Sequence, residues 1–362
     1  MNRRRVPERQ PGGSPAGILA QACSGAADRR CTALVISGGG AKGAFAAGVI
    51  QQIFREYRSK GWFSIIGGCS TGALITPLAG LLGAPGEIAE QALQELVNQY
   101  SNVHTSDILE KNSVIEFIKR QNCLNKSTPL RKRVNQVFRP ECFEWLRRED
   151  MPYCYVVYTN YQSGALEVAS PKDPGMSRER FIDAMIASAS VPVVMEPTII
   201  DGQVCYDGGV RDLLPFARAI DLGAETIVPI MLDAGRVPPS ESRFRRLDKV
   251  LFRTLAIMLD ETGENDLQMA NRINTAILAK GEILQALAGR PHCRKKIRAI
   301  FDKEEYRELF GSEKRLVRII DGLRPDQALT DNPMRFNPEL MQRWIELGRQ
   351  KAHSVLTTNP FA

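Results

Sequence analysis

The sequence predicts an α/β fold with a mostly parallel sheet, followed by a C-terminal helical extension. Two successive strand–turn–helix units from residue 31 onward indicate the sheet, because such units bring each strand back in the same direction. After residue 235 the apolar spacing is that of amphipathic helices, with no strand-like run of comparable strength. We therefore expect a disordered leader over residues 1–30, an α/β domain over 31–235 and a helical extension over 236–362.

The expected elements follow one another in a regular order. The first unit has a strand over 32–37 and a helix over 44–58, and the second has a strand over 62–66, a tight turn over 67–72 and a helix over 73–82. Residues 86–150 are expected to form helices with charged faces, one of which opens at 127–129 with Ser127 as its cap. The remaining strands are expected over 152–161, 165–169, 198–206 and 226–232, and the remaining helices over 181–189, from about 215, and over 247–259, 266–288 and 338–355.

The composition is that of an ordinary globular protein. Of 362 residues, 43% are hydrophobic and 25% are charged, which indicates neither wholesale disorder nor a fibrous scaffold. No run approaches the roughly 18 apolar residues that span a bilayer, and the apolar run within 16–22 is short for a signal peptide. We expect a cytoplasmic protein.

The net charge and the cysteine pattern limit the classes of partner and cofactor that we expect. The formal charge of +7 favours an anionic surface only weakly, and no nucleic-acid-binding signature accompanies it, so a peripheral membrane surface is the better candidate partner. The basic segment 243–253 can lie on such a membrane or form a solvated helix face. The eight cysteines show no CxxC pair and no metal spacing with histidine, which predicts a reducing compartment and no metal site.

A glycine-rich turn follows the first strand. Gly38-Gly-Gly-Ala-Lys-Gly43 lies between a strand and a helix, where backbone N–H groups at a helix N-terminus converge on an anion. The segment also satisfies G-x-G-x-x-G, but a dinucleotide site wants an acidic residue at the end of the second strand, where this sequence has Ile66-Gly67-Gly68. A purely structural glycine turn is the third interpretation.

The second turn matches a nucleophile elbow. Gly68-Cys-Ser-Thr-Gly72 fits G-x-S-x-G directly after a strand and directly before a helix, a context that exposes the serine and favours developing negative charge. The pattern alone is common by chance, and an ordinary turn serine is the alternative. Together with the preceding glycine turn, the context predicts Ser70 as a nucleophile.

A serine nucleophile needs a base, and histidine is scarce in this chain. None of the three histidines follows a strand end, so each is expected to be a surface or packing residue: His104, His292 and His353. Asp207 comes directly after a strand and before two glycines, where active sites of open sheets collect. A turn carboxylate, as expected for Asp201 and Asp233, is the alternative. Because a carboxylate in a water-poor pocket is a stronger base than in solution, Asp207 is the predicted base.

Four segments occur in a recognisable order and spacing: Gly38–Gly43, Gly68–Gly72, Ala187-Ser-Ala-Ser-Val-Pro192 and Asp207-Gly-Gly209. They resemble the patatin-like phospholipase family over Leu34 to Leu222. The resemblance implies a three-layer α/β/α sandwich and hydrolysis of fatty acyl esters of glycerophospholipids or neutral lipids. It also implies a Ser–Asp dyad that works without a metal or cofactor.

The resemblance assigns roles residue by residue. Ser70 would be the acylated nucleophile and Asp207 the proton acceptor, with an oxyanion hole formed by the amides of Gly38, Gly39 and Gly40. The residues that would support these motifs are Ala41, Lys42, Gly43, Gly68, Cys69, Thr71, Gly72, Gly208 and Gly209. Ala187–Pro192 is expected to shape the pocket beside the dyad or to end a helix. Cys69 and Gly209 are mild departures from the family pattern.

The same motifs leave other functions open. A non-lipid esterase, a thioesterase or an acyltransferase can use the same dyad, and a catalytically idle scaffold can act through the helical extension. The sequence encodes no preference for acyl chain, head group or ester position, and no oligomeric state. The expected partner is a lipid or ester substrate, without nucleic acid.

Overall fold

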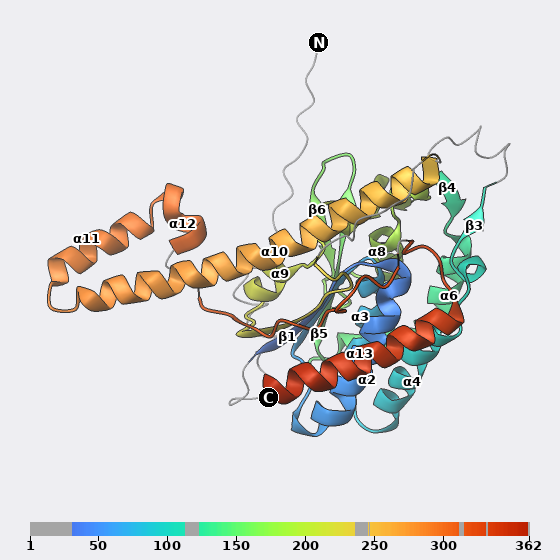
Figure 1. The fold of residues 1–362 in the computed structure, drawn as a ribbon, viewed down its shortest axis with the longest axis horizontal. Helices are drawn as coiled ribbons and strands as arrows, with labels where there is room; N and C mark the ends of the chain where they lie inside the picture. The colour runs from blue at the N-terminus through green and yellow to red at the C-terminus, as the bar shows by residue number, and fades with distance from the viewer. Residues whose placement is uncertain are drawn as a thin grey trace, which may run out of the picture.

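The computed structural model describes residues 31–112, 123–235, 245, 247–310, 315–330 and 332–360 (Figure 1). The expected leader over 1–30 lies outside these residues. Within them, an eight-stranded sheet forms the centre, in the order β11-β10-β1-β2-β5-β9-β8 with β6 also paired to β5. Its strands are β1 Thr32–Ile36, β2 Ile65–Cys69, β5 Tyr153–Asn160, β6 Leu166–Ala169, β8 Thr198–Ile200, β9 Gln203–Asp207, β10 Thr226–Ile230 and β11 Arg318–Ile319.

The sheet is mostly parallel, as the strand–turn–helix pattern predicts. β11, β10, β1, β2 and β5 run parallel, with Ala33 opposite Ile65 and Ile65 opposite Tyr153. β6 and β9 pair with β5 in the antiparallel sense, and β8 returns against β9. The carboxyl ends of β1, β2 and β10 therefore meet at one edge, where open α/β sheets carry their sites.

Helices cover both faces of the sheet, which confirms three layers (Figure 1). Side chains alternate along β1: Leu34 and Ile36 enter the core on one face, and Ala33 and Val35 enter the core on the other. The second face is covered by α9 Phe216–Asp221 and α10 Leu247–Ala286. The first face is covered by α2 Gly43–Tyr57, α3 Thr71–Leu81, α4 Glu87–Ser101, α6 Thr128–Val137, α7 Pro140–Arg147, α8 Arg178–Ala189 and α13 Pro338–Thr358.

The second strand lies three residues further along the chain than the pattern predicts. Trp62 precedes it and packs its ring edge-on against Phe54, with its indole N–H bound to the Ala79 carbonyl oxygen at 2.9 Å. Gly67, predicted as a turn residue, lies in β2 opposite Tyr155, whose ring occupies the space that a side chain at position 67 would need. The expected turn over 67–72 therefore shortens to Ser70 alone.

The strand expected over 198–206 is a hairpin. β8 and β9 are joined at Asp201 and Gly202, whose φ angles of 50° and 75° lie in the left-handed region. An Asp-Gly pair with two positive φ angles is typical of a two-residue hairpin turn. The prediction of one continuous strand over 198–206 was wrong, because the spacing of apolar residues alone does not indicate this turn.

The region 86–150 is not entirely helical. A second sheet forms from β3 Glu110–Lys111, β4 Cys123–Lys126 and β7 Val193–Met195. Ser127 precedes α6 as predicted, but its side chain does not cap the helix. Its hydroxyl donates to the Glu196 carboxylate at 2.9 Å, and the Ser127 amide donates to the same oxygen at 2.9 Å. Because Glu196 directly follows β7, these two bonds connect the short sheet to the start of α6.

The C-terminal region contributes to the main sheet and its core. The helices expected over 247–259 and 266–288 are one helix, α10, and the two-residue strand β11 adds to β10, contrary to the expectation of a tail without strands. α13 crosses α2 closely: a side chain at Gly48 would overlap the Ile345 carbonyl, and one at Gly348 would overlap the Phe45 carbonyl. The domain boundary near residue 235 remains a prediction.

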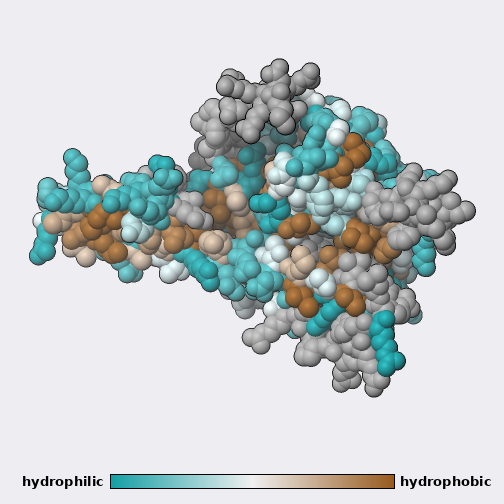
Figure 2. Space-filling model, turned by 90° about the horizontal axis from the view of Figure 1, so that it is seen from above, coloured by the Kyte–Doolittle hydropathy of each residue, from teal (hydrophilic) through white to brown (hydrophobic). Residues whose placement is uncertain are grey.

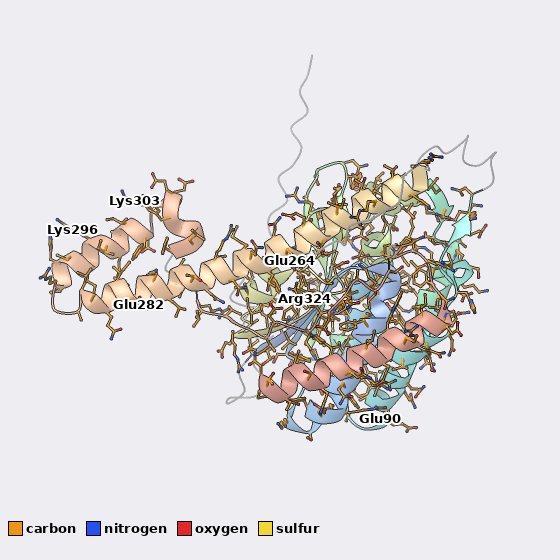
Figure 3. All side chains as sticks on the ribbon, viewed as in Figure 1. Glu90, Glu264, Glu282, Lys296, Lys303 and Arg324 are labelled. Atoms are coloured by element: carbon orange, nitrogen blue, oxygen red, sulfur yellow. The ribbon has the colours of Figure 1, made fainter. Side chains whose placement is uncertain are left out.

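α10 extends well beyond the sheet and carries a helical arm (Figure 1). Figure 3 shows Glu264 beside Arg324 within the body, where the two side chains form an ion pair, and Glu282, Lys296 and Lys303 out on the arm. The arm is completed by α11 Pro291–Phe301 and α12 Glu304–Phe310, whose Phe301 and Phe310 rings stack at 5.1 Å. In the described ranges, no helix combines the length and the apolar character that crossing a bilayer requires.

Candidate active site

Ser70 occupies a strained turn between β2 and α3. Its φ of 54° and ψ of −122° place a non-glycine residue in the left-handed half of the backbone map. Such a conformation costs on the order of 1–3 kcal/mol and persists only where the surroundings enforce it. A side chain at Gly68 would overlap the Gly72 carbonyl, and one at Gly72 would overlap the Ile36 carbonyl. The two glycines of the elbow are therefore required by close backbone approach.

Strand β5 brings the two predicted catalytic residues together. Cys69, which precedes Ser70, lies opposite Val157, and Asp207 lies opposite the next residue, Tyr158. The carboxyl ends of β2 and β9 thus meet on consecutive residues of one strand. At Gly208 a side chain would approach the Val157 carbonyl to 2.6 Å, so a glycine is needed directly after the aspartate.

The Asp207 carboxyl is buried and hydrogen-bonded to the elbow. Only 4% of the residue is exposed, and its Oδ1 accepts the Gly209 amide at 2.8 Å. Burial raises the pKa of Asp207 to about 6, while hydrogen bonds from the Ser70 side chain, the Gly209 amide and Cys69 lower it. Burial dominates, so this carboxyl holds a proton more tightly than an exposed aspartate does.

The Cys69 thiol contacts the Asp207 carboxyl. Its thiol lies 3.7 Å from Asp207 Oδ1, and burial, followed by the charge of Asp207, raises the pKa of the thiol well above its usual value. The thiol therefore stays protonated and acts as a weak donor.

The glycine turn predicted as an oxyanion hole lies beside the elbow. A side chain at Gly38 would come within 2.8 Å of Ser70 Cβ, so the turn and the serine are in direct contact. Among the described residues, the amides of Gly38, Gly39 and Gly40 have no backbone acceptor, whereas Ala41 and Lys42 donate to the carbonyls of other residues. Three unpaired amides thus precede α2, at its electropositive end.

Two serines of the Ala187–Pro192 segment accept hydrogen bonds from the backbone amides of Ser70 and Asp207. Ser188 Oγ accepts the Ser70 amide at 2.9 Å, and the Ser190 carbonyl accepts the Asp207 amide at 2.9 Å. Both serines are fully buried. Sequence analysis expected this segment to shape the pocket or to end a helix, and it missed that the segment binds the backbone of both Ser70 and Asp207; only the position of the segment in the motif order carried that signal.

Lys42 and Asp233 form an ion pair beside the turn. Lys42 is 7% exposed, and both residues line the cavity described below. Asp233 follows β10 at the same edge of the sheet, and sequence analysis, which expected an ordinary turn carboxylate, did not predict its ion pair with Lys42. Its place directly after a strand end was the available signal.

An apolar cavity of about 460 Å³ opens at Ser70. Ser70, Thr71, Gly39 and Gly40 line one end. The Thr71 hydroxyl lies 2.7 Å from the hydroxyl of Tyr100, which also lines the cavity. The walls come from α3, α4, α6, α8, α10 and the segments 328–330 and 332–336, with apolar side chains such as Leu74, Leu96, Val134, Met185, Leu255 and Phe336.

The histidines lie away from this site. His104 precedes a 3₁₀ turn, His292 lies in α11 on the arm, and His353 Nδ1 lies 2.6 Å from a Glu56 carboxylate oxygen on α2. None of the three lines the cavity. Within the part of the chain that the structure describes, no three His, Cys, Asp or Glu side chains gather in a way that could hold a metal ion.

The chain belongs to the patatin-like phospholipase family, which residues 34–220 match. Uncharacterized NTE family proteins of Mycobacterium bovis and Mycobacterium tuberculosis are 24% identical over 212 residues, 58% of this chain and 51% of theirs. The chain thus spans about half the length of these curated relatives. The crystal structure of VipD from Legionella pneumophila is similar with a TM-score of 0.46 at 13% identity, over 91% of this chain and 67% of VipD. Family membership supports a lipid hydrolase of the patatin type.

Proposed function

We propose that this protein is a serine lipid acyl hydrolase that works through a Ser70–Asp207 dyad and an acyl-serine intermediate. The observation that carries the proposal is that a strained elbow serine and a buried carboxyl meet beside consecutive residues of β5, at an apolar cavity. Because no histidine approaches the serine, the carboxylate is the base within reach.

Acylation begins with attack of Ser70 Oγ on the ester carbonyl carbon, while the hydroxyl proton moves to the Asp207 carboxylate. A base works best when its pKa lies near the working pH, and the pKa of about 6 at Asp207 suits this role better than that of an exposed aspartate. The tetrahedral intermediate then collapses, and the proton passes from Asp207 to the departing alkoxide. The products of this half-reaction are a free alcohol and acyl-Ser70.

Deacylation repeats these steps with water. Asp207 accepts a proton from a water molecule as its oxygen attacks the acyl-serine carbonyl, and the proton returns to Ser70 Oγ when the fatty acid departs. In both halves the negative charge develops on the former carbonyl oxygen. The amides of Gly38, Gly39 and Gly40 are the donors that meet it, and one such donor is typically worth about 10²–10³ in turnover.

The cavity favours a fatty acyl chain as the group that is transferred. Aliphatic side chains dominate its walls, and burying a methylene group there contributes about 0.8 kcal/mol. A short polar acyl group would gain little from these walls. We therefore assign long-chain lipid esters, rather than small polar esters, as the substrate class.

The first turns of α10 are proposed to face the lipid surface. Lys249, Arg253, Ala256 and Asp260 line the cavity with a spacing of three or four residues, so one helix face closes the site. Val250, Ile257 and Met258 of the same turns are between 41% and 53% exposed. Figure 2, seen from above, shows hydrophobic patches on the body as well as along the arm. Apolar side chains beside a basic residue suit an anionic membrane surface.

Active-site labelling tests the proposed chemistry. Wild-type protein should react with a fluorophosphonate and hydrolyse long-chain lipid esters. Ser70→Ala should abolish labelling and lower turnover by about 10⁴–10⁶-fold. Ser163→Ala, at an exposed serine, is the matched control and should behave as wild type. Undiminished labelling of Ser70→Ala would remove Ser70 from the mechanism.

Substrate competition separates the proposal from its rivals. Phospholipid micelles, a short p-nitrophenyl ester, an acyl thioester and an added alcohol acceptor are presented to the same preparation. A lipid hydrolase favours the micelles and releases free fatty acid. Preference for the thioester, or transfer to the alcohol, would indicate a thioesterase or an acyltransferase. A preparation that neither labels nor turns over would indicate a scaffold.

A further inference from the structure

The turn of Gly38, Gly39 and Gly40, here called the oxyanion turn, packs against three different parts of the chain. A side chain at Gly38 would come within 2.7 Å of Leu213, and one at Gly39 within 2.7 Å of Leu232. At Gly40, where φ is +56°, a side chain would overlap the carbonyl oxygen of Pro333. The third support lies more than a hundred residues beyond the end of the family match at residue 220.

Pro333 also binds the turn directly. Its carbonyl oxygen accepts the Ala41 amide at 2.7 Å, which pairs the first amide after the three glycines. The Lys42 amide donates to the Gly39 carbonyl at 3.2 Å. The turn is thereby fixed on both sides, and the amides of the three glycines are left for the substrate oxyanion. Three adjacent glycines would otherwise have wide backbone freedom.

Side-chain hydrogen bonds keep residues 332–336, here called the strap, in this position. Asn332 Oδ1 accepts the Met334 amide at 3.0 Å and so bends the chain around Pro333. Thr105 Oγ1 accepts the Phe336 amide at 3.0 Å and donates to the Phe336 carbonyl at 3.3 Å. The strap is thus held at both ends. A hydrogen bond within the strap holds its start, and Thr105, in the segment after α4, holds its end.

The strap also forms part of the cavity wall. Asn332, Pro333, Met334 and Phe336 all line the cavity that opens at Ser70. One short segment therefore touches both the amides that stabilise the oxyanion and the space that receives the acyl chain. A segment that only covered the fold would not need to contact either.

We propose that the strap is a positioning element of the catalytic site, which holds the oxyanion turn in its reactive geometry through the Pro333 carbonyl. The proposal rests on the acyl hydrolase function given above. It assigns a catalytic contribution to a segment outside the region shared with the family. A misplacement of the turn by about 1 Å would lower turnover by about 10²-fold, without removing any residue of the dyad.

Release of the strap by Thr105→Val tests the proposal. This change keeps the shape of the side chain and removes both hydrogen bonds to Phe336. We expect kcat on a short soluble ester, per active site titrated, to fall tenfold to a hundredfold with little change in KM, and fluorophosphonate labelling to slow in parallel. Thr105→Ser should restore both rates. Thr357→Val, which removes a hydroxyl on the exposed face of α13, is the matched control.

Hydrogen exchange of the peptide that contains Ala41 gives a readout independent of turnover. In Thr105→Val the Ala41 amide should exchange faster than in the wild type and in Thr357→Val, because its acceptor has moved. Unchanged exchange, or a kcat per titrated site equal to that of the wild type, would overturn the proposal even if the melting temperature fell. If the wild type itself neither labels nor turns over while exchange still responds, the proposed function fails and the catalytic role of the strap fails with it.

Discussion

The two ends of the substrate cavity are built in different ways. The elbow, the glycine turn and the aspartate lie at the carboxyl ends of β2, β1 and β9, each within a short local motif. Another part of the wall comes from α10 and the strap, which reach the site from the last third of the chain. The chemistry is therefore encoded locally, whereas the shape of the site depends on contacts between distant segments.

This difference determines which substitutions each region can tolerate. Residues such as Gly68 and Gly72 have no free space, since a side chain would overlap neighbouring backbone. The wall is lined by flexible apolar side chains that can be exchanged for one another with modest cost. We expect changes at the strand ends, or in the contact between the strap and the glycine turn, to alter turnover, and changes in the apolar side chains of the wall to alter the choice of acyl chain.

Among the changes that leave Ser70 in place, Asp207→Asn should have the largest effect on turnover. The amide can still accept the Gly209 hydrogen bond but cannot take the serine proton, so kcat should fall by about 10³–10⁴-fold. The melting temperature at pH 8 should be equal to or above that of the wild type. The pKa of Asp207 is raised to about 6 by burial, so its ionisation costs stability as pH rises from about 4 to about 6, and asparagine avoids this cost. Circular dichroism melting and an ester assay measure both quantities.

Ser188→Ala should have the next largest effect. It removes the acceptor of the Ser70 amide and leaves a buried N–H unpaired, which costs about 1–3 kcal/mol. The elbow can then relax away from its strained conformation, and kcat should fall by roughly tenfold to a hundredfold. The exposed residue Ser163 again supplies the control, as Ser163→Ala. A Ser188→Ala enzyme with full activity would show that the elbow holds its geometry without this bond.

The enzyme should lose activity as the pH falls below neutral. Asp207 must be ionised to accept the proton, so below its pKa of about 6 the rate should fall about tenfold for each pH unit. Labelling by a fluorophosphonate, followed as a rate against pH, should show the same dependence. A profile that stays flat down to pH 4 would mean that another group, or the carboxylate in a different setting, acts as the base.

The smallest effect on turnover, but a clear one on stability, is expected for Gly348→Ala. The added methyl group would overlap the Phe45 carbonyl where α13 crosses α2, and overpacking of this kind costs about 1–3 kcal/mol. Gly281→Ala, on the part of α10 where nothing lies within 4 Å, should instead leave stability unchanged or raise it by up to about 1 kcal/mol. Urea denaturation compares the two. Equal stability of both variants would indicate that the C-terminal region folds separately from the α/β domain.

Sequence analysis predicted what local patterns encode. The strand–turn–helix units, the elbow around Ser70 and the strand end at Asp207 were all found from spacing and composition, and the predicted fold class is confirmed. The hairpin at Asp201 was missed although an Asp-Gly pair is a hairpin signal, because apolar spacing was weighed more heavily. The roles proposed for Ser70 and Asp207 remain predictions that the assays above test.

The residues that sequence analysis missed act through tertiary contacts. Ser188 lies 118 positions from the amide that it holds, and Asp233 lies 191 positions from Lys42. Pro333 contributes a backbone carbonyl, which no side-chain motif can reveal. Such contacts depend on where the sheet and α13 place each segment, and a single sequence carries no local signal for them.

Mass analysis of the trapped intermediate tests the central claim most directly. The protein is mixed with a slowly deacylated long-chain p-nitrophenyl ester, quenched in acid during turnover and digested. The account predicts that the peptide containing Ser70 gains the mass of the acyl group, and that Asp207→Asn accumulates little of this species. Acyl mass on a cysteine or on another serine of an active preparation, with the Ser70 peptide unmodified, would contradict it.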